Sequence, residues 1–237
     1  KWEETANTVI LDNEVFEQIG IDISVDTDDP TNNTKFYKWE ISETWEVVMP
    51  DNITALDGKG MPYQTFVIVP EEKKQCWVTR KSQNILVKSV DNQVDSKVNN
   101  FVVKRIGPEE DKLFLRYSIE VQQYRLDKSM YEFWDKLKEF NEDAGTLYDR
   151  VPLSIYGNIR CCDNDSKVLG YFYAAEVKTK RIFIERGQHN VLSVNDYEGC
   201  LYVSDPTLHP FVSGFYARSA FCGDCRFYGS NQKPDFW

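Results

Sequence analysis

Residues 113–124 read LFLRYSIEVQQY, and this stretch decides the fold class. Its apolar residues occupy every second position, and mostly polar residues stand between them. The alternating apolar set is Leu113, Leu115, Tyr117, Ile119 and Val121, set against Phe114, Arg116, Ser118, Glu120 and Gln122. Because successive side chains of a strand point to opposite faces, this period of two predicts a strand with one buried and one wetter face. Such strands are typical of antiparallel sheets.

Similar patterns predict further strands on both sides of this stretch. In residues 36–48, Tyr37, Trp39 and Ile41 lie on one face, while Lys38 and Glu40 lie on the other. Runs rich in Val, Ile, Thr and aromatic residues, bounded by turn residues, indicate the remaining strands. These are residues 20–26, 63–69, 75–79, 85–90, 101–106, 153–160, 168–175, 181–185 and 200–203.

The period changes after residue 128. In residues 129–144, SMYEFWDKLKEFNEDA, the apolar side chains follow helical spacing. They are Met130, Phe133, Trp134, Leu137 and Phe140. Ser129 and Glu132 fit a capping box, and Gly145 stands where a helix commonly ends. We therefore predict one amphipathic helix over residues 129–145.

These patterns predict a mainly β fold, with an antiparallel, β-sandwich-like body and one amphipathic helix as an insert. The 237 residues are 41% hydrophobic and 14% aromatic, which is enough to fill one large core. We expect a single compact unit over residues 1–237. The alternative is a β-sandwich over 1–126 followed by a helix-plus-β part over 127–237, although neither residue 126 nor residue 150 offers a flexible linker.

The charge of the chain argues against two classes of binding partner. The formal net charge is −10, and Lys and Arg are scattered among acidic residues instead of forming a basic stripe. This distribution argues against a nucleic-acid partner and against direct adsorption to an anionic bilayer. Apolar runs such as 66–69 are far too short to span a membrane. The chain starts at Lys1 without Met or a leader, so we expect an export signal or lipid anchor to lie upstream or to have been removed.

The cysteine pattern indicates disulfide bonding in an oxidising compartment. There are six cysteines, at positions 76, 161, 162, 200, 222 and 225, and only two histidines. The segment 221–237 is irregular and rich in turn residues, so a covalent bond is expected to hold it to the body. At least one of Cys222 and Cys225 should form a disulfide, either with the other or with Cys200. Cys200 is the better partner, because the longer loop stabilises more.

No catalytic, cofactor-binding or metal-binding set emerges from the sequence. The CxxC at 222–225 lacks the second ligand pair of a zinc site, and no helix pattern follows it as in a redox dithiol. The acidic turn containing Asp22, Asp26, Asp28, Asp29 and Asn32 does not fit an EF-hand. A pair of carboxylates could serve a glycosidase, but the sequence does not select one among 38 acids. Trp237, in a polar tail, is a candidate for stacking on a ligand.

Several short stretches, in a fixed order, resemble a domain-of-unknown-function family of Bacteroidetes outer-membrane lipoproteins encoded beside TonB-dependent receptors. The stretches are YKWE (37–40), ETWE (43–46), CW (76–77), YSIEVQQY (117–124), YEFW (131–134), LK (137–138), GNI (157–159), LGYF (169–172), KRIFI (180–184), CGDCR (222–226) and KPDFW (233–237). The resemblance implies that this chain is the C-terminal portion of such a protein. The adjacent Cys161 and Cys162 depart from the family pattern, so their redox state stays open.

The resemblance implies a non-enzymatic lipoprotein at the cell surface or outer membrane. Its partner would be a TonB-dependent receptor, and its role substrate capture in nutrient uptake. It would touch the membrane only through a lipid anchor outside this chain, and it would need no cofactor. The resemblance assigns no binding or catalytic residue. Two alternatives are a secreted hydrolase acting on glycans and a structural β-sandwich module for adhesion.

Overall fold

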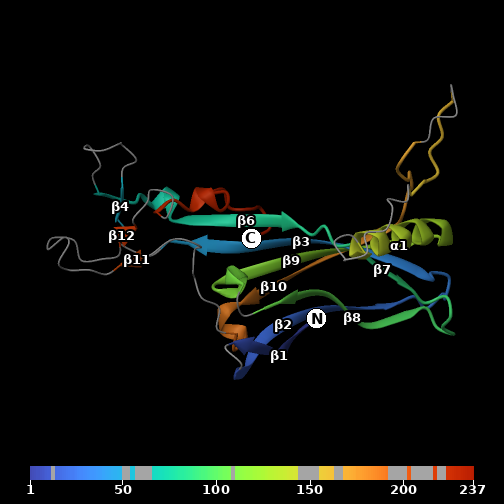
Figure 1. Ribbon diagram of the computed structural model, residues 1–237, viewed down its shortest axis with the longest axis horizontal. Helices are drawn as coiled ribbons and strands as arrows, with labels where there is room; N and C mark the ends of the chain where they lie inside the picture. Colours follow the sequence, from blue (N-terminus) through green and yellow to red (C-terminus); the bar gives the residue numbers. More distant parts are fainter. Residues whose placement is uncertain are drawn as a thin grey trace.

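The computed structural model describes residues 1–11, 14–49, 54–56, 66–107, 110–143, 155–162, 168–191, 202–203, 216–217 and 223–237. These residues form three sheets and one α-helix, α1 (Lys128–Asp143) (Figure 1). Among the described strands antiparallel pairing dominates, and only β12 and β4 pair in parallel. The prediction of a mainly β, sandwich-like fold with one helix is therefore confirmed.

The strands divide among the sheets as follows. The first sheet is β1 (Trp2–Leu11), β2 (Glu14–Asp28) and β8 (Lys97–Ile106). The second is β10 (Val177–Glu185), β9 (Arg116–Leu126), β3 (Phe36–Val48) and β6 (Gln75–Lys81), with β7 (Leu86–Ser89) also paired to β3. A small third sheet is β11 (Tyr202–Val203), β12 (Tyr216–Ala217), β4 (Thr54–Leu56) and β5 (Phe66–Ile68). Short 3₁₀ turns lie at Glu71–Lys73, Asp111–Leu113, Arg186–Gln188 and Cys225–Phe227.

The core lies between the first two sheets, which face each other in Figure 1. Trp39 on β3 and Tyr117 on β9 are fully buried, as the alternation of those strands predicts. Trp39 reaches across the sandwich to Phe101 on β8, with the two ring centroids 4.7 Å apart. Its Nε1–H donates to Oε1 of Gln123 at 3.0 Å, so the indole brings no unpaired donor into the core. This contact joins the two sheets.

The strand and helix predictions differ from the structure in several places. β3 has the predicted bounds, and α1 matches the predicted helix closely. Asp127, and not Ser129, caps α1, because its Oδ1 accepts the N–H of Met130 at 2.8 Å. β1 was not predicted, and Leu113 lies in a 3₁₀ turn before β9. Residues 144–145, 63–65 and 200–201 lie outside the described residues.

The predicted strands at 153–160 and 168–175 are wrong where the structure describes them. Residues 155–160 and 168–175 form no strand, and one bridge between Tyr156 and Leu169 joins them. The composition that indicated strands belongs instead to an extended segment, whose successive aromatic side chains point to opposite sides. The five-stranded sheet itself contains strands from both sides of residue 126, since β9 pairs with both β3 and β10.

The C-terminal segment 223–237 is tied to β6 by a disulfide. Cys225 bonds to Cys76, with Cα atoms 5.6 Å apart, so the expectation that Cys200 is its better partner is wrong. Trp77 and Ser230 also exchange two backbone hydrogen bonds, at 2.8 and 2.9 Å. A Cβ on Gly229 would stand 2.4 Å from the carbonyl oxygen of Trp77. The segment therefore lies directly against the outer edge of β6. Cys200 and Cys222 lie outside the described residues.

A buried ionic cluster lies on the core face of β3 and β9. The carboxylate of Glu43 accepts the hydroxyl of Tyr117 at 2.9 Å and the ammonium of Lys112 at 3.1 Å. Lys112 also pairs with Glu110 at 2.6 Å. Burial raises the pKa of Tyr117 well above its usual value, and the charge of Glu43 raises it further. The phenol therefore stays protonated and donates to Glu43 across the ordinary pH range.

Loss of the Cys76–Cys225 disulfide should destabilise the C-terminal segment first and the whole fold second. Replacing both cysteines by serine is expected to lower the free energy of unfolding by about 2–5 kcal/mol, because the bond closes a long loop. Urea unfolding measures this loss, and hydrogen exchange at the amides of Trp77 and Ser230 reports the release of the segment. Cys162→Ser is the control, since this exposed thiol forms no disulfide. An unchanged urea midpoint in the double variant would contradict the prediction.

The Glu43 cluster gives a second prediction, with a matched control on the same strand. Tyr117→Phe leaves the buried Glu43 carboxylate without one donor, so unfolding should become easier by about 1–3 kcal/mol. Tyr124, also on β9, donates to the exposed Glu40 on β3. Tyr124→Phe should therefore cost less than about 1 kcal/mol, because water replaces the lost partner. Equal losses in the two variants, measured by chemical denaturation, would show that burial of the carboxylate does not govern the effect.

Candidate functional site

An extended arm, here defined as residues 155–162 and 168–176, leaves the body beside α1 (Figure 1). Two glycines bring the two halves of the arm together. A Cβ on Gly157 would stand 1.7 Å from the carbonyl oxygen of Gly170, so only glycine fits at position 157. Gly170 itself has φ +115°, which other residues rarely adopt. The crossing of the two halves is thus fixed by backbone contact.

The carboxamide of Asn158 fixes the backbone at Phe172. Its Nδ2 donates to the carbonyl oxygen of Phe172 at 2.7 Å, and its Oδ1 accepts the N–H of the same residue at 2.8 Å. One side chain thereby satisfies both backbone groups, as a neighbouring strand would. Phe172 is held in place at its backbone while its side chain is 78% exposed.

The base of the arm packs on α1 through aromatic rings. Tyr171 lies against Phe133 with centroids 5.0 Å apart, and Tyr173 lies edge-on to Trp134 at 6.2 Å. The hydroxyl of Tyr171 is also within 2.7 Å of Oγ of Ser129. Because the segment is extended, Tyr171 and Tyr173 turn toward the helix and Phe172 between them turns away from it.

Lys38 on β3 contacts both α1 and the arm. Its ammonium lies 3.9 Å from the centroid of the Trp134 ring and 3.5 Å from the hydroxyl of Tyr173, and it forms an ion pair with Glu40. Its side chain is only 4% exposed. Burial alone would raise the pKa of Glu40, but hydrogen bonding to Lys38 and Tyr124 lowers it overall, so Glu40 stays charged beside the lysine. A buried cation on an indole face is worth about 2 kcal/mol, which makes Lys38 an anchor between sheet and helix.

The arm carries four exposed apolar side chains. Leu169 is 65% exposed, and Tyr156 and Ile159 are also exposed. With Phe172 they form what we call the arm surface. Such groups of exposed apolar side chains commonly mark contact sites for another macromolecule. A fixed backbone lowers the entropy cost of binding through these side chains.

The residues singled out in the sequence lie elsewhere. Trp237 is half-buried, with its ring edge-on to Phe183 at 5.9 Å and the guanidinium of Arg116 5.2 Å from its centroid. Protein groups therefore contact this ring, and its role in ligand stacking stays a prediction. Hydrogen bonds from the side chains of Thr31 and Thr34, and then from the backbone N–H groups of Thr34 and Thr31, hold the pKa of Asp29 well below its usual range.

Asp22, also in the acidic turn, forms an ion pair. Asp22 accepts hydrogen bonds from Nε and Nη2 of Arg105, at 2.7 and 2.8 Å. Within the described residues, no three His, Cys, Asp or Glu side chains meet as a metal site requires. In the same part of the chain, no helix is long and apolar enough to cross a bilayer. Cys161 and Cys162, in the arm, are free thiols.

Sequence reasoning assigned no role to Lys38, Asn158 or Phe172, although each lies in a stretch that carries the family resemblance. The structure brings these stretches together. YKWE supplies Lys38 and Glu40, YEFW supplies Phe133 and Trp134, and GNI and LGYF form the crossing in the arm. The sequence did not indicate these contacts, because each stretch is short and its partner lies far away along the chain.

Comparison with known proteins identifies a family without a known activity. Residues 2–181 match the family described as domain of unknown function DUF4249. The matched range contains β3, α1 and the whole arm. No curated protein and no solved structure matches the chain. Since the match covers more than half of its residues, the chain belongs to the DUF4249 family.

Proposed function

We propose that this protein is a non-enzymatic accessory of a TonB-dependent receptor, exported to the outer membrane or cell surface, and that the arm surface binds the receptor. In this proposal it is part of an outer-membrane lipoprotein of the Bacteroidetes type and assists capture or uptake of a nutrient. The observation that carries the proposal is Phe172, whose side chain is exposed while Asn158 fixes its backbone.

Three features support this reading. An exposed aromatic residue costs a monomeric protein solubility, so its fixed presentation favours a role in binding. Tyr171 and Tyr173 pack on α1, and Lys38 links α1 to β3, so the base of the arm is held to the body. The Cys76–Cys225 disulfide favours an oxidising compartment outside the cytosol.

The test is recovery of the receptor with the full natural protein. The protein is expressed in its own host, tagged and purified from mild detergent extracts, and the co-purifying outer-membrane barrel is quantified. In Leu169→Ser/Phe172→Ser, recovery of the receptor should fall about tenfold or more, because removal of two exposed apolar anchors costs about 1.4 kcal/mol or more. Val94→Ser is the matched control, since Val94 is 88% exposed and lies in the turn after β7.

A second variant separates the shape of the arm from its composition. Gly157→Ala keeps every apolar side chain of the arm but cannot keep the contact with Gly170. It should reduce receptor recovery while leaving the melting temperature of the sandwich nearly unchanged. Recovery at the natural level in both arm variants would refute docking through the arm. Turnover of a glycan that is lost on a single Asp or Glu substitution would instead support a hydrolase.

A further inference from the structure

The edge strands of the second sheet are protected from pairing with another chain. An edge strand exposes unused backbone N–H and C=O groups, and proteins commonly cover it, shorten it, bend it or place cations on it. β6 is bridged by the C-terminal segment, since Trp77 and Ser230 exchange backbone hydrogen bonds, and β7 has only four residues. β10, at the opposite edge, carries Lys178, Lys180 and Arg181. Each of these edges therefore disfavours a further strand.

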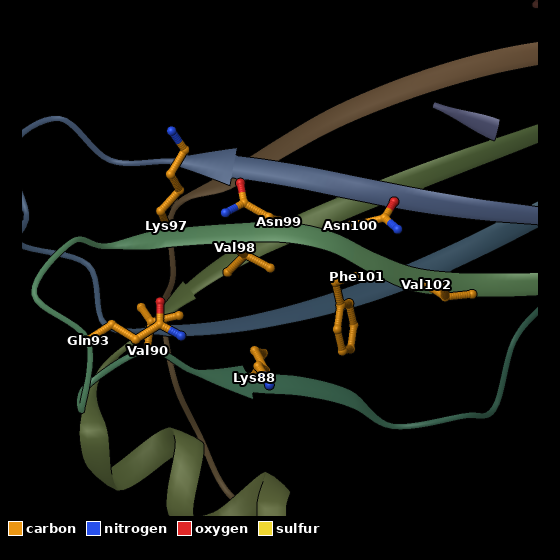
Figure 2. A pocket seen from close by; sticks show the side chains of 9 residues that line it. All are labelled: Lys88, Val90, Gln93, Lys97, Val98, Asn99, Asn100, Phe101 and Val102. Carbon is orange, nitrogen blue, oxygen red and sulfur yellow. The ribbon is translucent and has the colours of Figure 1, made fainter. Parts of the chain in front are cut away.

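The two edges of the first sheet differ from each other. β8 ends this sheet beside a cavity of about 520 Å³, and Figure 2 shows Asn99 and Asn100 on the side of β8 away from β7. The register between β2 and β8 shifts twice, and Asn100 has φ +51°. Because bulges bend and twist a strand, β8 lacks the regular backbone that a further strand would pair with. β1, at the other edge, pairs one to one with β2 over ten residues without a shift.

β1 has none of the usual forms of edge protection. Its sequence, WEETANTVIL, contains no Lys, Arg, Pro or Gly. Within the described part of the chain, only β2 forms backbone hydrogen bonds to β1. Asn190 lies beside it, but bonds to the carboxylate of Glu4 and not to its backbone. Ten extended residues span about 34 Å, so β1 is a long and regular template for pairing.

The hydrogen bonds at the start of β1 determine which of its backbone groups point outward. Lys1 and Ser24 exchange two main-chain hydrogen bonds, each 3.0 Å long, so they form a hydrogen-bonded pair of the antiparallel ladder. Such pairs recur at every second residue, which directs the N–H and C=O groups of Glu3 and Thr5 toward β2. The residues that alternate with them direct these groups away from β2. They are Trp2, Glu4, Ala6, Thr8 and Ile10.

We propose that β1 pairs with β1 of a second copy of this chain, in antiparallel orientation about a two-fold axis at Ala6. The outward residues are symmetric about Ala6 along the strand. In the paired strands Ala6 lies opposite Ala6 of the partner, Glu4 opposite Thr8, and Trp2 opposite Ile10. Each outward N–H then meets an outward C=O, and two three-stranded sheets become one continuous sheet. The proposal does not depend on receptor binding through the arm.

Charge and symmetry favour a second copy as the occupant of this edge. Glu3 and Glu4 are the charged residues of β1, and both are exposed. In the antiparallel register they lie opposite Val9 and Thr8 of the partner, so like charges do not face each other. An unrelated strand would have to match this order of groups, whereas a second copy matches it by symmetry. A two-fold contact also uses the same edge of both copies, so assembly stops at the dimer.

The size of the contact predicts a weak and reversible dimer. An edge about 34 Å long and about 10 Å thick buries on the order of 340 Å² per copy, less than half of the roughly 800 Å² of a standard interface. We therefore expect a dissociation constant in the micromolar range or weaker. Sedimentation velocity of the full chain, over a series of rising concentrations, should show monomer converting to dimer.

Three variants of Ala6 test the pairing. Ala6→Pro removes an N–H that points away from β2, so it breaks the central pair of the dimer and keeps the ladder with β2. Ala6→Lys places like charges opposite each other at the axis. Each should weaken dimerisation at least about tenfold. The melting temperature of the monomer should stay nearly unchanged, because Ala6 is exposed. Ala6→Ser is the matched control, since it keeps the N–H and adds no charge.

Hydrogen exchange identifies the strand that forms the contact. A rise in protein concentration should slow exchange at the outward amides of Glu4, Ala6 and Thr8. A chain that stays monomeric at every concentration would overturn the proposal, as would dimers that persist in both Ala6→Pro and Ala6→Lys. Protection of these amides that does not change with concentration would assign the edge to another segment of the same chain. Oligomers larger than the dimer would contradict closure by a two-fold axis.

Discussion

The packing of Trp39 between the two large sheets is the contact on which the rest of the structure depends. The indole stacks on Phe101 of the opposite sheet, is fully buried, and donates its only N–H to Gln123. β3, which carries it, pairs with β9, β6 and β7, so its position sets those of all the neighbouring strands. The preceding residue, Lys38, points to the opposite face and contacts the ring of Trp134 on α1. One step along this strand therefore connects the core to the base of the arm.

Two features of the fold could be predicted because they depend on local order. The alternation in 36–48 and 113–124 determines which side chains enter the core, and the change of period at 129 marks the helix. The pairing of Cys225 with Cys76 could not be predicted, since the two are 149 residues apart and nothing in the spacing of the cysteines selects this pair. It follows from the edge of β6 being open to the C-terminal segment, which is a property of the assembled sheet.

The arm shows why a correct pattern can lead to a wrong element. The sequence YFY at 171–173 has the aromatic composition of a strand, and the segment is indeed extended. Its neighbour is not a ladder of backbone groups, however, but one asparagine side chain and a glycine contact. The spacing of residues does not predict the contact between Gly157 and Gly170, because this contact depends on the position of both backbone segments in the folded structure. The candidate site therefore could not be predicted from the sequence, although the stretches that form it are among those that carry the family resemblance.

The order in which cysteines appear along the chain has a consequence for biosynthesis. A polypeptide that enters an oxidising compartment from its N-terminus exposes Cys76 first, then Cys161, Cys162, Cys200 and Cys222, and only then Cys225. Among the six cysteines of this sequence, the correct partner of Cys76 enters last, and four other thiols enter before it. If oxidation is fast, Cys76 pairs first with one of these four. Thiol–disulfide exchange is the chemical route from an early mispaired bond to the native one. Native pairing of Cys76 with Cys225 therefore requires either thiol–disulfide exchange or oxidation that is slow enough to follow folding.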